Sequence, residues 1–569
     1  MKALVVAGIA VAVSAFAGDT EFAVGVATSM ESVRPRAGYV VRPASEVRIR
    51  LARDEYESVQ VLVAASNDLK NVTVHVDGDL NRIAGDGVVF AASNITSSVV
   101  GYVHTTNVPP YKVRPTWKKP ETGWWADPIL DFQKSADVAK GDVQSFWVRV
   151  KCPRGQEPGT YVGTLSVLAD GEDSVRLPFT VRVNAFAIGA SSPLPLMVSC
   201  FAPWVRNNAL PKEGRDEIAR RIRNSDYFKA WKSNEVAYCD FLSDYYVSWG
   251  ADLYPGGDSS GEPRWAMLKR QKDRGRLGFF NLYLWYPMGG GPNAEAEWRK
   301  KTIPVIRARY EKAKTLGIAD HAILYGCDEA DPPAFTNVAR TAAELRREFP
   351  DVPVMTTARD YNFGTGDSPL REVNAFCPII SKFLGPKIAE ARAEGRKVWW
   401  YISCDPCCPW PNTLIECPPI ETRSLMGAMT QKFKPDGFLY YATTHWYAKD
   451  PIKEGPFTKW EPRSFGAYHG DGQWTCCGGP DNMPLPTIRL ENFRDGVEDL
   501  WYVKLLEEKL REVESSKLKV ESEEWIRRAK AALAVPNEVA RSVAKFSTDS
   551  DVIYRWRDAM ADLIEAAPH

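Results

Sequence analysis

The chain has 569 residues, more than one ordinary core holds, and a domain size of about 100–200 residues predicts two to four structural units. Lys and Arg together number 72, and so do Asp and Glu. A net charge of zero gives no electrostatic reason to expect binding to nucleic acid or to an anionic membrane surface. A neutral or locally recognised partner fits this composition better.

The N-terminal residues 1–17 have the pattern of a secretory signal peptide. Met1-Lys2 precedes an apolar stretch over residues 3–13, and Ala15-Phe16-Ala17 forms a small-x-small cleavage site. The apolar stretch is too short to cross a bilayer, and no later segment reaches the roughly 18 apolar residues that a spanning helix needs. We therefore expect a secreted or periplasmic protein with no integral membrane segment in the mature chain.

Eleven cysteines permit disulfides in an exported protein, and the odd number leaves at least one thiol unpaired. Cys404, Cys407 and Cys408, with Cys417 and Cys476-Cys477 further along, offer zinc coordination as an alternative. The second half of that set lacks the CxxC spacing of a two-knuckle site, which favours disulfides or buried thiols. Nothing in the sequence calls for a metal or a cofactor.

Residues 18–190 are rich in short alternating runs separated by turn formers. Val47-Arg48-Ile49-Arg50-Leu51 and Val59-Gln60-Val61-Leu62-Val63 alternate with a period of two, and Pro158-Gly159-Thr160 marks a turn. No helical period is present. This pattern predicts an antiparallel β-sandwich.

Over residues 191–483, apolar runs alternate with longer amphipathic stretches. Eight runs read as strands: 194–203, 235–242, 278–285, 322–327, 352–357, 373–380, 398–403 and 437–443. The helix candidates between them are 212–223, 294–316, 333–349, 386–394 and 424–433. The alternation predicts a (β/α)₈ TIM-like barrel, distorted where the connection from the fifth to the sixth strand is too short for a full helix.

Residues 484–569 form the last unit. Phe493, Val497, Trp501 and Leu505 recur at four-residue spacing, and a second candidate helix covers 551–564. We expect a helical region packed on the barrel.

The adjacent acids Asp328-Glu329 follow the apolar run of residues 322–327. Buried strands are usually apolar along their length, so two carboxylates at a strand tip need a reason beyond folding. Active sites of (β/α)₈ barrels lie at the C-terminal ends of the strands, which makes both acids candidate catalytic residues. A salt-bridged acidic pair at the barrel rim is the structural alternative.

Other polar and aromatic residues close the neighbouring strands and should converge on the same face. Aromatic rings with a polar edge can stack on sugars, although core packing explains many of them equally well, including Tyr325. Arg359 can bind a hydroxyl or form a rim salt bridge. The candidate substrate-binding residues are Trp285, Tyr325, Arg359, Trp400, Tyr401, Tyr441 and Trp446.

Several segments resemble glycoside hydrolase family 123 and the wider group that shares its C-terminal domain, DUF4091. The N-terminal half has residues 52–60, Phe146-Trp147-Val148 and residues 158–164 of that family's sandwich. The C-terminal half has residues 398–401, 437–441, 470–472, 488–490 and 494–499. The resemblance covers nearly the whole mature chain and is carried by the order and spacing of motifs that are individually weak.

The resemblance implies an exo-acting β-N-acetylgalactosaminidase that retains anomeric configuration, with a glycoconjugate or oligosaccharide as its glycan substrate. Glu329 would be the general acid/base and Asp328 the partner of the substrate's acetamido group. The family pattern has a Pro after the Glu, where this chain has Ala330.

Adjacency of the acids fits a substrate-assisted reaction. An ordinary retaining glycosidase holds its two carboxyl groups about 5 Å apart on opposite sides of the bond, which neighbours on one strand cannot easily achieve. When the sugar's own 2-acetamido oxygen attacks the anomeric carbon, the protein needs one acid and one group that stabilises the oxazolinium ion.

Two alternatives stay open. A glycosidase of the same fold could act on a different sugar, in which case substrates without a 2-acetamido group would be cleaved well. A non-catalytic secreted glycan-binding or surface scaffold would bind sugar even after loss of both acids.

Overall fold

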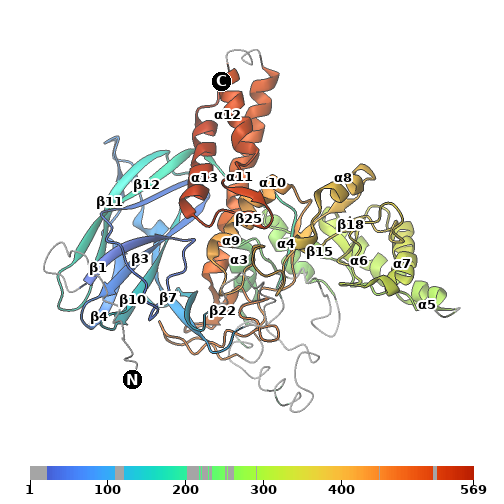
Figure 1. Cartoon of the computed structure of the whole chain (residues 1–569), viewed down its shortest axis with the longest axis horizontal. Helices are drawn as coiled ribbons and strands as arrows, with labels where there is room; N and C mark the ends of the chain where they lie inside the picture. Colours follow the sequence, from blue (N-terminus) through green and yellow to red (C-terminus); the bar gives the residue numbers. More distant parts are fainter. Residues whose placement is uncertain are drawn as a thin grey trace, which may run out of the picture.

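The computed structural model describes residues 22–108, 121–200, 217, 220, 229, 233–249, 253, 262–289, 291, 293–446, 449–516 and 522–568. The predicted signal peptide over 1–17 and most of the predicted helix over 212–223 lie outside these residues. In Figure 1 a β-sandwich occupies one side of the molecule and parallel strands with their helices occupy the other. Long C-terminal helices stand between the two and project beyond them.

The N-terminal region is a sandwich of two sheets. The first has the order β1-β3-β10-β7-β8, with every pair antiparallel. Its strands are β1 (Phe22–Thr28), β3 (Tyr56–Ala65), β10 (Val143–Lys151), β7 (Ile95–Thr105) and β8 (Gly123–Leu130). The second has the order β2-β12-β11-β4-β9, with β5 and β6 attached at β11. Its strands are β2 (Val47–Arg53), β12 (Val175–Ala187), β11 (Gly159–Leu168), β4 (Leu69–Val76), β9 (Ser135–Val138), β5 (Leu80–Arg82) and β6 (Val89–Phe90).

One pairing departs from the antiparallel prediction. Strand β2 runs parallel to β12, with Val47 opposite Phe179 and Leu51 opposite Val183. The alternating apolar residues of β2 are buried as expected. Side-chain alternation reports which face of a strand is buried, and it carries no information on the direction of the neighbouring strand.

Two parallel sheets make up the strands of the second region. One has the order β14-β13-β21-β20 and the other β15-β16-β17-β18-β19. Their strands are β13 (Leu196–Cys200), β14 (Ser248–Trp249), β15 (Phe280–Asn281), β16 (Ala322–Tyr325), β17 (Val354–Thr356), β18 (Ala375–Phe376), β19 (Lys397–Val398), β20 (Trp400–Tyr401) and β21 (Phe438–Tyr440). Every pairing in both sheets is parallel.

At one edge, the chain passes directly from one parallel sheet into the other. Only Trp399 separates β19 from β20. At the other edge, the Phe279 N–H donates to the Leu196 carbonyl (2.7 Å), which brings the residue before β15 next to β13. A closed barrel would need contacts of this kind, and the closed (β/α)₈ barrel itself stays a prediction.

Side chains from both parallel sheets share one enclosed group, which we call the inner cluster. It consists of Met197, Leu253, Ile323, Tyr325, Met355, Ala375, Cys377, Trp399, Tyr401 and Leu439, with Phe279, Leu284, Ile379 and Tyr441 packed against it. Their chain neighbours Leu324, Val354, Trp400 and Tyr440 belong instead to the main core. The period of two within each strand therefore sorts residues between two faces.

One predicted strand is wrong. Residues 235–242 belong to helix α3 (Glu235–Asp244), and the strand at this point is the short β14. The buried residues of α3 include Tyr238, Cys239 and Leu242, which is helical spacing, while Val236 is exposed. A short apolar run does not distinguish a buried strand from one face of a helix.

Helices were predicted over 294–316, 333–349, 386–394 and 424–433, and the structure has helices there, two of them broken; α4 (Trp265–Asp273) was not predicted. Residues 294–316 form α5 (Ala294–Lys301) and α6 (Ile303–Thr315), and residues 424–433 continue α9 (Pro419–Ser424) through a π-helical turn (Leu425–Met429) into α10 (Thr430–Phe433). The described residues of this region also form helices α7 (Phe335–Glu348) and α8 (Gly385–Ala393). No helix lies between β17 and β18, as the short connection predicts; all residues there are described.

The C-terminal region begins with two short strands, β22 (Thr475–Gly478) and β23 (Met483–Pro486), which form a hairpin. Helix α11 (Ile488–Ser515) follows, and its N-terminus is capped by the Thr487 hydroxyl, which accepts from the Leu490 N–H (3.2 Å). Helices α12 (Glu523–Leu533) and α13 (Ser550–Glu565) flank it, joined by the hairpin of β24 (Ala540–Ser542) and β25 (Lys545–Phe546). Helices α11 and α13 were predicted from the sequence, whereas α12 was not.

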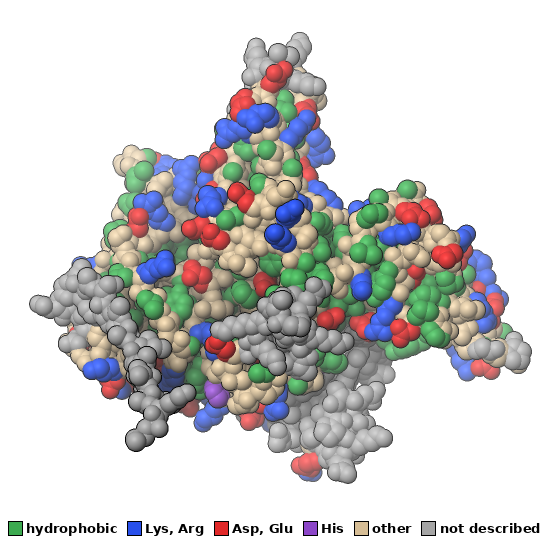
Figure 2. Space-filling view, viewed as in Figure 1, with side chains coloured by type: hydrophobic (Ala, Val, Ile, Leu, Met, Phe, Trp, Pro, Cys, Tyr) green, Lys and Arg blue, Asp and Glu red, His purple; other side chains and the backbone are tan. Residues whose placement is uncertain are grey.

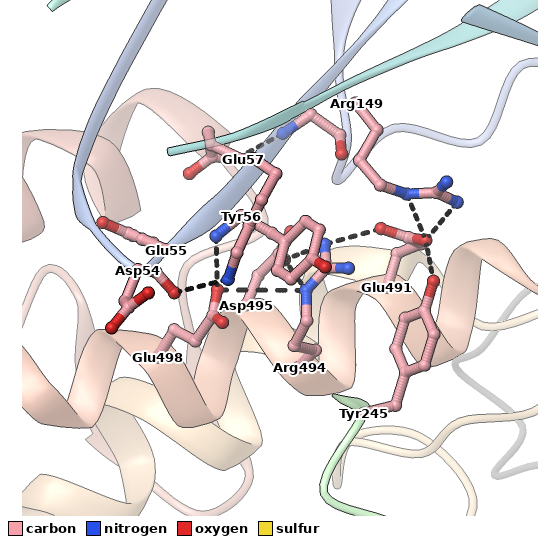
Figure 3. A network of polar contacts seen from close by, with 12 residues as sticks. Asp54, Glu55, Tyr56, Glu57, Arg149, Tyr245, Glu491, Arg494, Asp495 and Glu498 are labelled. Atoms are coloured by element: carbon pink, nitrogen blue, oxygen red, sulfur yellow. Dashed lines mark hydrogen bonds and ion pairs between the residues drawn. The ribbon is translucent and has the colours of Figure 1, made fainter. Parts of the chain in front are cut away.

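A buried network of carboxylates and guanidinium groups joins α11 to the sandwich. Arg149 of β10 donates to Glu491 (2.9 Å), which also accepts from Tyr245 and Arg494 (Figure 3). Arg423 of α9 bridges Glu57 of β3 and Asp499 of α11, with contacts of 2.9–3.1 Å. Gly496 lets the helices approach, because a Cβ there would lie 2.7 Å from the Arg423 carbonyl oxygen.

No helix among the described residues has both the length and the apolar character needed to cross a bilayer. The described residues, which include all eleven cysteines, contain no disulfide and no group of three or more His, Cys, Asp or Glu side chains that could hold a metal ion. Figure 2 shows Lys, Arg, Asp and Glu side chains intermixed over the visible face, consistent with the zero net charge.

The Arg423 site yields a test of the network. Arg423→Met removes a guanidinium that is fully buried and leaves the Glu57 and Asp499 carboxylates without it. Loss of one partner of a buried ion pair typically costs roughly 3–5 kcal/mol, so we expect a clear drop in the urea midpoint of unfolding followed by circular dichroism. Arg527→Met is the control, since Arg527 pairs with Glu524 on the surface of α12. Equal midpoints for the two variants would contradict the role given to the network.

Candidate active site

Asp328 and Glu329 lie in the turn that directly follows β16, and both side chains are exposed to solvent. Cys327 and Glu329 have left-handed backbone conformations, with φ of 51° and 47°. The Cys327 N–H donates to the Trp285 carbonyl at the end of the neighbouring chain segment (3.0 Å). The acids have therefore left the pleated strand, in which neighbouring side chains would point to opposite faces.

Gly326 contributes through its lack of a side chain. A Cβ at this position would lie 2.1 Å from the Trp285 carbonyl oxygen and 2.6 Å from the Trp285 ring. Gly326 forms an isolated parallel bridge with Trp285 and does not itself have a positive φ. It permits a close approach of two backbones at the base of the acidic turn, whereas the turn conformation is taken by Cys327 and Glu329.

Asp328 is held by two hydroxyl groups on the same oxygen. The Tyr325 hydroxyl donates to Asp328 Oδ1 (2.6 Å), and the Thr357 hydroxyl donates to the same atom (2.8 Å). Tyr325 is fully buried in the inner cluster, and Thr357 follows β17. Two donors aimed at one oxygen stabilise the carboxylate and fix its orientation.

Glu329 has different partners. The Tyr401 hydroxyl donates to Glu329 Oε1 (2.6 Å), and Arg359 donates to Oε2 (3.0 Å) and to Asp331 (2.9 Å). Burial, with the added effect of the Glu329 carboxylate, holds the pKa of Tyr401 far above its usual range, so this hydroxyl remains a donor. The Glu329 side chain itself is 43% exposed.

Thr357 links the two acids. Besides donating to Asp328, its hydroxyl oxygen accepts from the Glu329 N–H (2.9 Å). Arg359, two residues after Thr357, also contacts the turn: its backbone N–H donates to the Ala330 carbonyl (2.9 Å). The end of β17 therefore fixes the position of both carboxylates.

Ala330 takes part in the same turn. Its N–H donates to the Cys327 carbonyl (3.3 Å), a bond that a proline at this position could not make. With Ala330 at this position, the turn is closed by a backbone hydrogen bond.

Tyr441 belongs to the same side of the strands but contacts a different acid. It packs against the inner cluster, and its hydroxyl donates to Asp471 Oδ2 (3.0 Å), while Tyr440 approaches Oδ1 (3.3 Å). Burial raises the pKa of Asp471 to about 7. Asp471 and Glu329 both lie near the Cys404 thiol, whose pKa is raised to about 12 by burial first and then by these and other neighbouring groups.

The structure does not bring the three tryptophan candidates to the acids. Trp285 and Trp400 are fully buried in the main core, where the Trp285 indole donates to the Leu324 carbonyl (2.9 Å) and Trp400 packs against Phe383. Trp446 is also in the main core and donates to the Thr475 carbonyl (2.6 Å). Trp400 differs from Tyr401 by one residue, which on a strand places the two side chains on opposite faces.

The residues gathered around the acids are thus Tyr325, Arg359 and Tyr401, all expected from the sequence, and Thr357 and Asp331, which were missed. Thr357 ends a predicted strand and could have been found by the same strand-end rule that singled out Asp328. Asp331 carries no comparable signal. Asp360, also at a strand end, instead caps its own loop by accepting from Gly364 N–H (2.9 Å) and the Ser368 hydroxyl (2.6 Å).

Comparison with protein families decides the class. The model described as the catalytic domain of glycoside hydrolase 123 matches residues 292–506, which include the acidic turn. The model described as the glycoside hydrolase 123 N-terminal domain matches residues 46–169, so the two together cover more than half of the chain. The chain belongs to glycoside hydrolase family 123.

A solved family 123 glycoside hydrolase from Clostridium perfringens has the same fold. It aligns over 96% of this chain and 98% of its own, with 14% identity and a TM-score of 0.66, and its description concerns the hydrolysis of glycolipid glycans. A family 39 glycoside hydrolase from Bacteroides cellulosilyticus WH2 aligns over 80% of this chain and 82% of its own, with 10% identity and a TM-score of 0.31, too low to support an argument. No curated protein sequence matches the chain.

The Thr357 hydroxyl is suited to a direct test. Thr357→Val removes the bonds to Asp328 and to the Glu329 N–H, whereas Thr357→Ser keeps the hydroxyl. Because small displacements of catalytic groups can cost about a hundredfold in rate, we expect kcat for an aryl glycoside to fall ten- to a hundredfold in the Val variant. The Ser variant should stay within a fewfold of the parent, and a similar loss in both would show that the hydroxyl is not the relevant group.

Proposed function

We propose that this family 123 chain is an exo-acting, retaining glycosidase that removes a terminal β-linked N-acetylgalactosamine, or a related 2-acetamido sugar, by a substrate-assisted mechanism. The observation that carries the proposal is the separation of partners between two adjacent acids. Asp328 accepts from two neutral hydroxyl donors, while Glu329 contacts the Tyr401 hydroxyl and the Arg359 guanidinium. Two carboxyl groups in different environments suit two different tasks.

In the first step, the acetamido oxygen attacks the anomeric carbon and the bond to the leaving oxygen breaks. Glu329 donates its proton to that oxygen, and Asp328 accepts a hydrogen bond from the acetamido N–H and stabilises the positive charge of the oxazolinium ion. Water then attacks the anomeric carbon, Glu329 takes up its proton, and the acetamido group is released. Two displacements at one carbon give net retention.

Arg359 lies between two carboxylates, those of Glu329 and Asp331. Asp331 gives Arg359 a second carboxylate partner at 2.9 Å. Arg359 therefore stays paired when Glu329 is protonated, and it can stabilise the carboxylate that forms as the leaving oxygen takes the proton.

Further proposals concern the protein's location, its substrate and its fold. We propose that the chain is exported, on the sequence pattern of residues 1–17, and that its substrate is a glycoconjugate or oligosaccharide. The description of the Clostridium perfringens relative is consistent with a glycolipid among these. We also propose that the two parallel sheets form a (β/α)₈-type barrel around the inner cluster, which would account for side chains from both sheets meeting in one group.

The acid role of Glu329 predicts dependence on the leaving group. Glu329→Gln should lower kcat/KM by about 10²–10⁴ for a disaccharide, whose leaving oxygen needs a proton, and much less for a dinitrophenyl glycoside. Asp331→Asn is the matched control, because Asp331 also pairs with Arg359 and should show the same modest effect on both substrates. A Glu329→Gln loss that is equal for both leaving groups would rule out the role as general acid.

The assisted mechanism predicts a characteristic inhibitor profile. A thiazoline mimic of the oxazolinium ion should bind the wild type far more tightly than the parent sugar does, since it resembles a species close to the transition state. Asp328→Asn should lose most of this preference, while binding of the free parent sugar, measured by calorimetry, changes little. Efficient cleavage of substrates without a 2-acetamido group would exclude the mechanism, and sugar binding without turnover in the wild type would favour a scaffold.

A further inference from the structure

Phe465 is an apolar ring left in solvent beside Tyr441, which packs against the inner cluster. Its side chain is 51% exposed, although most large apolar side chains of the described residues are buried. Scattered exposed apolar residues are common, so exposure alone carries little weight. Phe465 differs from other exposed apolar residues in the rings that it contacts and in the polar contacts that hold its hairpin.

A short hairpin carries Phe465. Arg463 and His469 form an antiparallel bridge, and the Tyr468 N–H donates to the Phe465 carbonyl (3.1 Å). Gly466, with φ of 58°, follows Phe465 in the turn. The hairpin therefore presents the ring close to its tip.

Buried polar contacts hold the base of this hairpin. His469 forms a buried contact with Glu416, and Arg489 donates to the Gly470 carbonyl (2.9 Å). Asp471, two residues further on, accepts from the Tyr441 hydroxyl. Support of this kind pre-positions the tip, which reduces the cost of ordering it when a ligand binds.

The ring lies against Tyr441 and His445. Its centroid is 6.4 Å from that of Tyr441 in an edge-on arrangement and 6.3 Å from that of His445. Tyr441 packs against the inner cluster that contains Tyr325 and Tyr401, the two tyrosines that bind the acids. Aromatic residues thus lead from the acids, by way of the partly buried Tyr441, to the half-exposed ring of Phe465.

We propose that Phe465 is a stacking platform for the sugar or other flat, weakly polar group on the leaving-group side of the cleaved bond. This inference rests on the proposed function and names a substrate contact that the function alone does not specify. The face of a pyranose ring presents C–H groups, which pack on an aromatic ring while the hydroxyl groups at its edge stay hydrated.

The assignment of Phe465 to the leaving-group side rests on the increase in solvent exposure from the tyrosines at the acids to Phe465. An exo-acting enzyme encloses the terminal sugar and leaves the rest of the glycan toward solvent. Tyr325 and Tyr401, which touch the acids, are buried, whereas Phe465 is reached through Tyr441 and is half exposed. The exposed ring is therefore placed for the part of the substrate that extends away from the acids.

The test compares two substrates with the same terminal 2-acetamido sugar, a methyl β-glycoside and a β-linked disaccharide. For Phe465→Ala we expect kcat/KM for the disaccharide to fall about tenfold, mainly through KM, since one stacked ring contributes about this factor. The methyl glycoside, which has no second ring, should change less than twofold. Inhibition by the thiazoline, which occupies only the terminal-sugar position, should also change less than twofold.

Controls separate the possible failures. Phe465→Tyr keeps a ring and should retain the disaccharide preference, while Leu168→Ala removes an exposed apolar side chain from β11 of the sandwich and should change neither substrate. If the wild type cleaves both substrates and Phe465→Ala changes neither, or changes both equally, the platform is absent. If the wild type cleaves neither, the proposed function fails first, and the platform fails with it.

Discussion

The arrangement of the whole chain depends on the buried ionic network between the sandwich and α11. Its carboxylates and guanidinium groups are those of Glu55, Glu57, Glu491, Asp495, Glu498 and Asp499, and of Arg149, Arg423, Arg494 and Arg557. The acids in this set outnumber the bases by two. Burial raises the pKa of Asp495 to about 7 and that of Glu498 to about 8, so protonation of these two can bring the set close to charge balance near neutral pH. Charges removed from water are tolerated only when they are paired or neutralised in this way, which fixes how the two regions can be joined.

The same interface reaches the candidate site through Arg489. Its guanidinium binds Asp127 of the sandwich strand β8 (2.7 and 2.9 Å) and also donates to the carbonyls of Gly470 and Gln473. Asp471 lies between those two residues and holds Tyr441. The sandwich therefore braces the segment that supports one side of the site. The sandwich thus contributes to the site through buried hydrogen bonds. This contribution does not require the sandwich to bind sugar itself.

Seven of the eight strands predicted for the second region are present, and so is the acidic turn, because burial imposes a period of two and places polar residues at strand ends. It failed where two physical situations share one pattern. The run of residues 235–242 is apolar on one helical face, and Trp285 and Trp400 sit at strand ends yet point into the main core. The segments that resemble family 123 were also ambiguous, because their sequence does not say whether they form the active site or join the two regions. Residues 52–60 and 494–499 meet each other in the ionic network and not at the acids, so they report how the regions are joined. Contacts between side chains that are hundreds of residues apart, such as that of Arg423 with Glu57, leave no periodic signal in the sequence.

Adjacency of Asp328 and Glu329 raises a geometric problem that the turn resolves. On a strand the two carboxylates would face opposite ways, and only one could reach a substrate. Left-handed conformations at Cys327 and Glu329 are unfavourable for residues with a side chain, and they persist where the surroundings impose them. Here the imposed contacts are the bond from Cys327 N–H to Trp285, that from Ala330 N–H to Cys327, and that from Glu329 N–H to Thr357. A proline in place of Ala330 would lack the second of these bonds. Backbone strain at Cys327 and Glu329, held by three backbone donors, is costly for folding alone, and it places both carboxylates on one turn, as the proposed function needs.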